Sequence, residues 1–365
     1  MPPHPDTGSI APGTMTGRAR MLTAIQRQPV DTTPVWFMRQ AGRSLPEYRA
    51  LRETHDFMTV ATTPELAAKA TIMPVDRLGV DGAVLFADIM LPLASMGVPF
   101  RIEPGVGPVI DSPIRHERAV TNLRLTPAAE ATPYVFDAIR LLRQQLGDRA
   151  AVLGFAGAPF TLACYLIEGR GSREYPRAKA MMYGQPELWH RLMQTISDVT
   201  IDYLRNQAHA GADAIQLFDS WLGLVGPGTY DTHVLPYTSR IFEALRGTVP
   251  TIHFSTGTTS LLPQIASSGC DAVSVDWRLP LDLAWEHIGD ERAIQGNLDP
   301  TMALAPWPVV EDGVRDILLR ANGRAGHIFN LGHGILPMTD PDILARIVDF
   351  VHAAPVVANE TSSRS

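Results

Sequence analysis

The chain has 365 residues, 45% of them hydrophobic and 19% charged, and so can bury a large core in one large domain or two ordinary ones. Its net charge is −7 and no segment concentrates lysine and arginine, which argues against a nucleic-acid-binding protein. The longest apolar runs fall short of the roughly 18 residues of a membrane span, and no secretory signal is visible, which predicts a soluble cytoplasmic protein.

Short apolar segments alternate with longer segments that carry apolar residues at helical spacing. Eight apolar segments are predicted strands: Pro34–Met38, Gly82–Phe86, Ala151–Phe155, Asp213–Phe218, Pro250–Phe254, Ala272–Val275, Ala293–Gly296 and His327–Leu331. The predicted helices are Pro64–Leu78, Pro133–Leu146, Pro186–His209, Tyr237–Leu245, Thr259–Ala266, Val309–Ala321 and Pro341–Ala353. This alternation favours an α/β fold, a single (β/α)8 TIM barrel with its active-site cleft at the carboxyl ends of the strands.

The domain boundaries follow from composition. Residues 18–353 are predicted to form the barrel, and residues 1–17 and 354–365 are predicted to be flexible tails, since both are rich in small and polar residues. Within the barrel, Arg101–Asp111 reads as an inserted hairpin.

Polar or glycine-rich segments follow nearly every predicted strand. In chain order these are Arg39, Asp88, Gly154–Pro159, Asp219 with Ser220, His253 with Ser255, Asp276, Asn297 and His333. Because the carboxyl ends of barrel strands carry the active site in this architecture, we expect these residues to form its rim.

The stretch PVWFMRQAGRSLPEYR places Arg39 and Arg43 directly after a core strand. If the chain is helical there, the spacing of four puts both guanidinium groups on one face. A structural ion pair with Glu47 or Asp56 is one interpretation. Two arginines beside a glutamine and a flexible glycine favour a clamp for ligand carboxylates, because arginine binds them bidentately.

Four further residues are candidates for the site. Asp88 either caps a helix or offers a fixed negative charge to a ligand, and the sequence does not decide between these roles. Tyr165 and Ser220 read as hydrogen-bonding groups, since no nucleophile elbow surrounds the serine. His333 lies between two glycines, which would let the backbone and ring approach a ligand closely.

The two cysteines, Cys164 and Cys270, are predicted to be reduced core thiols rather than metal ligands. His253 and Ser255 form H-x-S, whereas a zinc thiolate site would favour H-x-C with a further cysteine near His333. We therefore predict no metal site.

Six motifs in order identify a resemblance to the uroporphyrinogen decarboxylase family. Its two signature stretches resemble WFMRQAGRSLPEYR and GFAGAPFTLACYLIEG. Four shorter motifs match in the same order: LFADI, LFDSW, QGNLDP and NLGHG. The likeness covers Leu22 to Val351. The resemblance implies a (β/α)8 barrel, a homodimer and an enzyme without a cofactor. It also implies removal of four acetate carboxyl groups from uroporphyrinogen III, giving coproporphyrinogen III and CO₂ in heme biosynthesis.

The resemblance also implies roles for individual residues. The substrate-binding set would be Arg39, Gln40, Ala41, Gly42, Arg43, Asp88, Tyr165, Ser220 and His333. Asp88 would face the pyrrole N–H groups and stabilise the cationic transition state. Ser44 replaces the tyrosine common at its position, a change we expect to alter loop packing rather than chemistry.

Two other functions are compatible with this barrel. The first is a zinc-dependent, corrinoid-linked methyltransferase of the related branch, which H-x-S in place of H-x-C argues against. The second is a tetrapyrrole-binding protein without catalytic activity. The presence of Asp88 argues against that function, because arginines alone would serve binding.

Overall fold

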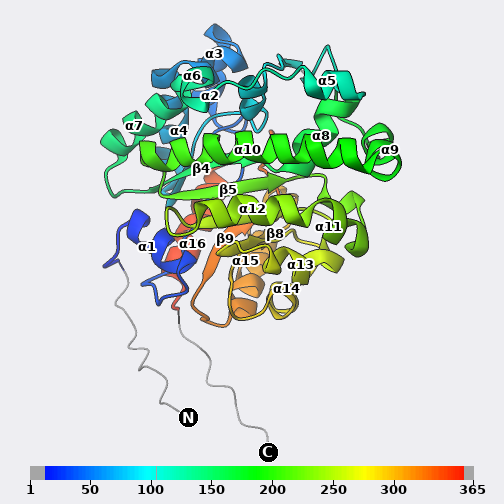
Figure 1. Ribbon diagram of the computed structural model, residues 1–365. Coiled ribbons are helices and arrows are strands. Elements are labelled where there is room, and N and C mark those ends of the chain that lie inside the picture. The colour runs from blue at the N-terminus through cyan, green and yellow to red at the C-terminus, as the bar shows by residue number, and fades with distance from the viewer. Residues whose placement is uncertain (1–12, 104, 357–365) are drawn as a thin grey trace, which may run out of the picture.

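The computed structural model describes residues 13–103 and 105–356 and shows an α/β fold around one curled parallel sheet (Figure 1). Seven strands pair in the order β1-β4-β5-β6-β7-β8-β9, and every pairing is parallel. The strands are β1 (Gly82–Val84), β4 (Ala151–Gly157), β5 (Ala214–Asp219), β6 (Thr251–Ser255), β7 (Ala272–Ser274), β8 (Ala293–Leu298) and β9 (His327–Leu331). Each coincides with a predicted strand, apart from differences of one or two residues at some ends.

The first predicted strand, Pro34–Met38, is not a regular strand. Only Val35 pairs, as an isolated parallel bridge to Phe329 of β9. The segment nevertheless lies between the two edges of the sheet, because the Phe329 N–H donates to the Pro34 carbonyl (2.8 Å) and the Asp81 N–H donates to the Val35 carbonyl (2.7 Å). The eight-stranded prediction is therefore confirmed for seven strands only.

Three aspartates tie neighbouring segments together at the amino ends of the strands. Asp81, Asp213 and Asp271 directly precede β1, β5 and β7. Their carboxylates accept the backbone N–H groups of Val35, Val152 and Thr251, which lie at the start of the Pro34–Met38 segment, β4 and β6. All three N···O distances are 2.8 Å. A carboxylate that satisfies a buried N–H stabilises the strand register and leaves the opposite end of the sheet free for other roles.

One of these aspartates belongs to a larger buried network. The Arg20 guanidinium donates to Asp31 (2.7 Å) and Asp81, and His352 Nε2 lies 2.8 Å from Asp81. Burial alone would raise the pKa of Asp31, but the hydrogen bonds from Arg20 and from the Met15 N–H lower it to about 2. Met15 is thus fixed to the core, although residues 1–17 were predicted to be a flexible tail.

Helices cover the outer face of the sheet (Figure 1). The α-helices are α1 (Gly17–Ile25), α2 (Pro46–Thr54), α3 (Phe57–Thr62), α4 (Pro64–Leu78), α5 (Glu117–Thr121), α6 (Ala128–Ala131), α7 (Pro133–Leu146), α8 (Pro159–Glu168), α9 (Pro176–Gly184), α10 (Pro186–Ala210), α11 (Pro227–His233), α12 (Leu235–Leu245), α13 (Leu262–Ser267), α14 (Leu281–Ile288), α15 (Trp307–Ala321) and α16 (Pro341–Ala353). Short 3₁₀ helices are η1 (Leu91–Met96), η2 (Leu222–Leu224), η3 (Thr259–Leu261) and η4 (Met302–Leu304).

The predicted helices are confirmed within a few residues, and three of them, α4, α7 and α16, have the predicted bounds. Many begin with proline, whose missing N–H costs nothing in the first turn. The predicted helix Thr259–Ala266 is instead η3 followed by α13. Among the described residues, no helix combines the length and apolar character needed to cross a bilayer.

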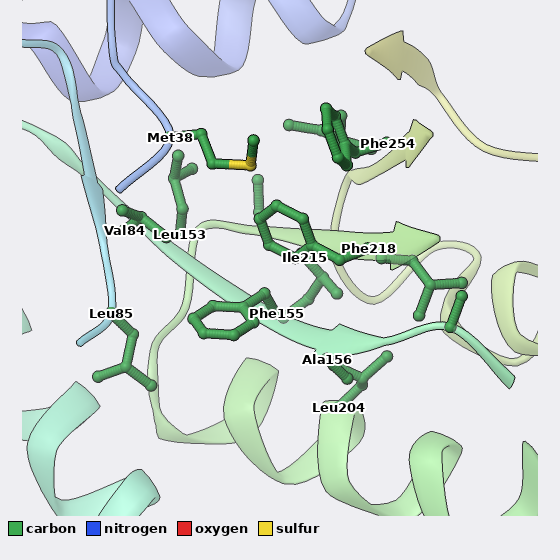
Figure 2. Packing of buried hydrophobic residues seen from close by; sticks show 14 of the residues in the cluster. Met38, Val84, Leu85, Leu153, Phe155, Ala156, Leu204, Ile215, Phe218 and Phe254 are labelled. Atoms are coloured by element: carbon green, nitrogen blue, oxygen red, sulfur yellow. The ribbon is translucent and has the colours of Figure 1, made fainter. Parts of the chain in front are cut away.

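The core has two layers, one between the sheet and the helices and one inside the curl of the sheet. Figure 2 shows Leu204 of α10 beside Ala156 of β4, with Met38 and Phe254 on the other side of that strand. Inside the curl, the rings of Phe155, Phe218 and Phe254 follow one another across β4, β5 and β6 at centroid distances of 5.3 and 5.4 Å. These rings lie near the carboxyl ends of their strands.

Two insertions lie at the carboxyl end of the sheet. The predicted hairpin is present as β2 (Arg101–Glu103) paired with β3 (Gly107–Val109), between β1 and its returning helix α7. Helices α8 and α9 separate β4 from its returning helix α10, and Figure 1 shows both near one end of α10.

Candidate functional site

Arg39 occupies the first loop after the Pro34–Met38 segment. The loop is not helical: Arg39 has φ +63°, and α2 begins only at Pro46. The sequence suggested that the spacing of four puts Arg39 and Arg43 on one helix face. This is wrong, because the loop between them is not helical. Instead, the Arg39 stem lies against Gly334, where a Cβ would come within 2.6 Å of the Arg39 Cδ atom.

Neither arginine of the predicted clamp has an ion pair among the described residues. Both are exposed, and the carboxylate proposed as the alternative partner, Asp56, instead caps α3 by accepting the Thr59 N–H at 2.7 Å. The structural ion-pair interpretation therefore has no support in the described part of the chain. Two guanidinium groups at one end of the sheet, neither in an ion pair, are thus available to an anionic ligand.

Gln40 is placed differently from the prediction. Its side chain is fully buried, accepts the Phe37 N–H through Oε1 (3.0 Å) and donates to the Gly82 carbonyl through Nε2 (2.8 Å). Both ends of the amide are thus occupied by backbone, so its side chain holds the Arg39 loop. Ala41 and Gly42 follow in the same loop and are half-buried.

Asp88 follows β1 at the same end of the sheet. One carboxylate oxygen, Oδ1, accepts the Met90 N–H at 2.8 Å in the turn before η1, but η1 has no side-chain cap, so the helix-capping interpretation is wrong. Burial raises the pKa of Asp88 to about 6, against the lowering effect of the Met90 N–H and the Arg39 charge. No hydrogen bond involves the second oxygen among the described residues, so the carboxylate keeps an acceptor for a ligand.

Tyr165 on α8 belongs to an aromatic cluster. Its ring lies 6.0 Å from the rings of Tyr175 and Trp221, and those two lie 5.0 Å apart. Burial raises the pKa of Tyr165, so the hydroxyl keeps its proton and can donate a hydrogen bond. The charges of Asp88 and Arg39 both act on this hydroxyl, which places it within electrostatic reach of each.

His333 follows β9 and faces the same arginine. Burial, together with the charges of Arg39 and Arg278, lowers the pKa of His333 to about 4, so its ring is neutral near pH 7. Its neighbouring glycines are required for packing within the protein. A Cβ at Gly332 would lie 2.5 Å from the Trp277 backbone nitrogen, and one at Gly334 would strike the Arg39 side chain.

A second buried acid lies beneath Ser220. Asp219 ends β5 with its Oδ1 accepting from the Thr161 hydroxyl at 2.7 Å, while its Oδ2 has no partner and lies 4.0 Å from Nε2 of His253. Burial raises the pKa of Asp219 to about 7 and lowers that of His253 to about 3, so both favour their neutral forms. Ser220 itself is half-buried and makes no side-chain hydrogen bond among the described residues.

The other predicted rim residues serve mainly the protein's own backbone. Asn297 donates to the carbonyls of Asp276 (2.9 Å) and Leu279 (2.7 Å), and Asp276 accepts from Arg278 and from the Gly257 N–H. Ser255 bonds to Thr258. The described residues contain no group of three His, Cys, Asp or Glu side chains arranged to hold a metal ion.

The structure therefore brings Asp88, Tyr165 and His333 within electrostatic reach of Arg39, and the His333 ring lies 6.0 Å from the ring of Phe254. Arg43 and Ser220 lie at the same end of the sheet and form no side-chain hydrogen bond or ion pair with these four among the described residues. Sequence reasoning did not include Arg278, Tyr175 or Trp221. Arg278 lies in VDWR and Trp221 in LFDSW, each just after a predicted strand, so the position after a strand was a signal for both; Tyr175 lies in GSREYP, which follows a helix.

Comparison with known proteins decides the family. The family model described as uroporphyrinogen decarboxylase (URO-D) matches residues 16–354. The chain belongs to the uroporphyrinogen decarboxylase family. It is 51% identical over 347 residues to the uroporphyrinogen decarboxylase of Thermobifida fusca, which covers 94% of this chain and 95% of the relative. It is 50% identical to that of Streptomyces coelicolor, covering 93% and 96%.

A solved structure supports the fold independently. A methyltransferase from Methanosarcina mazei superposes with a TM-score of 0.79 over 92% of this chain and 98% of its own. The two sequences are 19% identical, so this likeness concerns the fold alone. Members of the uroporphyrinogen decarboxylase family and this methyltransferase thus share one α/β architecture.

Proposed function

We propose that the protein removes the four acetate carboxyl groups of uroporphyrinogen III as CO₂ and yields coproporphyrinogen III. The observation that carries the proposal is that Arg39, which forms no ion pair among the described residues, lies within electrostatic reach of Asp88, a buried carboxylate with one oxygen left without a hydrogen bond. A macrocycle with anionic groups at its edge and N–H groups at its centre complements that pattern. Uroporphyrinogen has this distribution of charge and hydrogen-bond donors.

We further propose that Pro34–Met38 acts as the eighth strand and closes a (β/α)8 barrel. The segment bonds to β9 on one side and to Asp81 on the other. Asp81 also accepts its Val35 N–H, as Asp213 does for β4 and Asp271 does for β6. The segment thus takes the position that β4 and β6 take in the repeating pattern, which supports its role as a strand.

In the proposed reaction, the substrate supplies the electron sink. Protonation of the pyrrole carbon beside the acetate-bearing carbon gives an iminium-like cation. The carbon–carboxylate bond then breaks, CO₂ leaves, and the bonding electrons neutralise the cation; a proton on the exocyclic carbon and loss of the ring proton complete the methyl group. Each turnover of one acetate consumes one proton overall. Asp88 stabilises the cation through its fixed negative charge.

The remaining residues position the substrate. Arg39 and Arg43 bind acetate or propionate carboxylates, with the Ala41–Gly42 backbone between them. Tyr165 donates a hydrogen bond from its hydroxyl, Ser220 hydrogen-bonds a further carboxylate, and neutral His333 does the same without adding charge beside Arg39. Positioning of this kind contributes by holding each acetate in reactive geometry in turn. We also propose a cytoplasmic homodimer that works without a cofactor or metal.

Incubation with uroporphyrinogen III under anaerobic conditions tests the function. We expect four equivalents of CO₂ and a four-carboxylate product, with activity unchanged after exhaustive chelation. Methyl transfer from a corrinoid, or activity that is lost on chelation and restored by zinc, would instead place the protein with the methyltransferases. Binding without CO₂ release would indicate a tetrapyrrole carrier.

A further inference from the structure

A second basic feature lies outside the site described above. A surface cleft of about 570 Å³ runs between the β2–β3 hairpin and the junction of α8 with α9. Its charged lining residues are Arg101, Arg115, Arg170, Arg177, Asp111 and Glu168. Four arginines face two carboxylates in a chain whose net charge is −7, so the cleft is a local exception to the overall charge.

The cleft lies at the same end of the sheet as Asp88 and Tyr165. The hairpin and helices α8 and α9 are the insertions between strands and their returning helices, which places them beyond the carboxyl ends of the strands. Tyr165 and Glu168 are three residues apart on α8, so one helical turn separates the site from the cleft wall. Figure 1 shows α8 and α9 together at one end of α10.

Two of the four arginines are already neutralised or occupied. Arg101 pairs with Glu103 (2.6 Å) and with Asp111. Arg115 directs Nε and Nη2 to the last carbonyls of α8, those of Ile167 and Glu168, both at 3.0 Å. These two residues build the walls of the cleft.

The other two guanidinium groups lack partners. Among the described residues, the side chains of Arg170 and Arg177 form no ion pair or hydrogen bond. Glu168 makes no ion pair with Arg177; its Oε1 accepts the Arg177 backbone N–H at 2.7 Å. The cleft therefore presents two guanidinium groups that form no ion pair among the described residues.

The walls that carry these cations are fixed. The Ile110 N–H donates to the Gly169 carbonyl (2.7 Å), the Ile114 N–H donates to the Leu166 carbonyl (2.8 Å), and Val109 bridges Arg170. Gly169 has φ +90°, and a Cβ there would lie 2.7 Å from Pro113, so the hairpin arm packs tightly on this turn. A preorganised wall reduces the ordering cost of binding an anion.

We propose that this cleft is an outer docking site for a molecule with two or more carboxylates, here the side chains of the incoming porphyrinogen. The inference rests on the proposed function and adds a step to it: Arg170 and Arg177 capture a polycarboxylate before its transfer to Arg39 and Arg43. A negative protein repels an octacarboxylate at long range, and a local cationic cleft beside the site offsets that repulsion and raises the association rate.

The test compares two double charge reversals. Arg170→Glu with Arg177→Glu changes the cleft, while Arg205→Glu with Arg246→Glu changes two exposed arginines near the carboxyl ends of α10 and α12, toward the other end of the sheet. We expect the first variant to lose about ten-fold in kcat/KM at low salt, with kcat unchanged and a flatter dependence on ionic strength. The second variant should keep the wild-type values.

Calorimetric titration of the unliganded protein with citrate, a tricarboxylate, gives a readout that needs no turnover. Wild-type protein and the Arg205/Arg246 variant should bind an equivalent of citrate that the Arg170/Arg177 variant does not bind. If this difference holds but uroporphyrinogen is not decarboxylated, the docking site stands and the proposed function fails. Equal citrate binding by all three proteins, or equal kcat/KM for both variants, would overturn the docking site.

Discussion

Replacement of Arg43 by alanine separates a ligand clamp from a structural arginine. Arg43 is exposed and has no ion pair among the described residues, so its removal leaves no carboxylate orphaned. We expect the free energy of unfolding of the unliganded protein to change by less than about 0.5 kcal/mol. Substrate binding should weaken by about 2 to 5 kcal/mol, or roughly 30- to 5,000-fold in Kd, because one partner of a charge pair is lost.

Arg20→Ala is the matched control. The same residue type is buried there and donates to both Asp31 and Asp81, so its removal leaves two buried carboxylates without their cation. We expect a loss of about 3 to 5 kcal/mol, which lowers the melting temperature by roughly 4 to 7 °C in a protein of this size. The folded fraction should bind substrate normally.

The assay measures the melting temperature of each unliganded variant and the Kd for coproporphyrinogen III under anaerobic conditions. The clamp predicts that Arg43→Ala changes Kd and not melting, and that Arg20→Ala does the opposite. A strongly destabilised Arg43→Ala protein with unchanged affinity in its folded fraction would refute the reasoning.

Three further predictions follow from the contacts around the site. Burial raises the pKa of Asp219 to about 7, so its neutral form stabilises the folded state at low pH, and that contribution is lost as pH rises from about 4 to about 7. Asp219→Asn should therefore make the free energy of unfolding depend less on pH across this window. An unchanged dependence on pH would contradict the assignment. Gly334→Ala should displace the flexible Arg39 stem and weaken substrate binding with little change in melting temperature. The Cβ of Gly332→Ala would meet the Trp277 backbone, so this variant should destabilise the fold. Equal effects of the two substitutions would contradict the different roles of these glycines. Gln40→Ala leaves the Phe37 N–H and Gly82 carbonyl unpaired and should cost about 1 to 3 kcal/mol in urea unfolding, while normal stability with weakened binding would restore its predicted ligand contact.

Much of the fold could be predicted because local signals agree with it. Helices α4, α7 and α16 each begin with proline and carry a continuous apolar face, and their bounds were predicted correctly. The Pro34–Met38 segment has the composition of a strand, but its pairing depends on how two distant edges of the sheet meet. Sequence alone does not fix that geometry.

The site was predictable where a residue type implied its chemistry, and less so where tertiary contacts decide its role. The exposed arginines and Asp88 lie at the end of the sheet that the strand pattern indicated. The resemblance implied a ligand contact for Gln40, yet the Phe37 N–H and the Gly82 carbonyl occupy both ends of its amide. The closeness of Asp219 to His253 depends on the register of β5 with β6, which no local pattern reveals.

The central claim is that Asp88 stabilises a cation that forms on the substrate. Asp88→Asn preserves the size of the side chain and an oxygen that can accept the Met90 N–H, but removes the charge. The most direct measurement is the single-turnover rate of CO₂ release from uroporphyrinogen III by this variant, together with its Kd for the substrate. We expect a rate lower by about two to three decades, with Kd changed only a few-fold. A near-normal rate, or a loss confined to Kd, would contradict it.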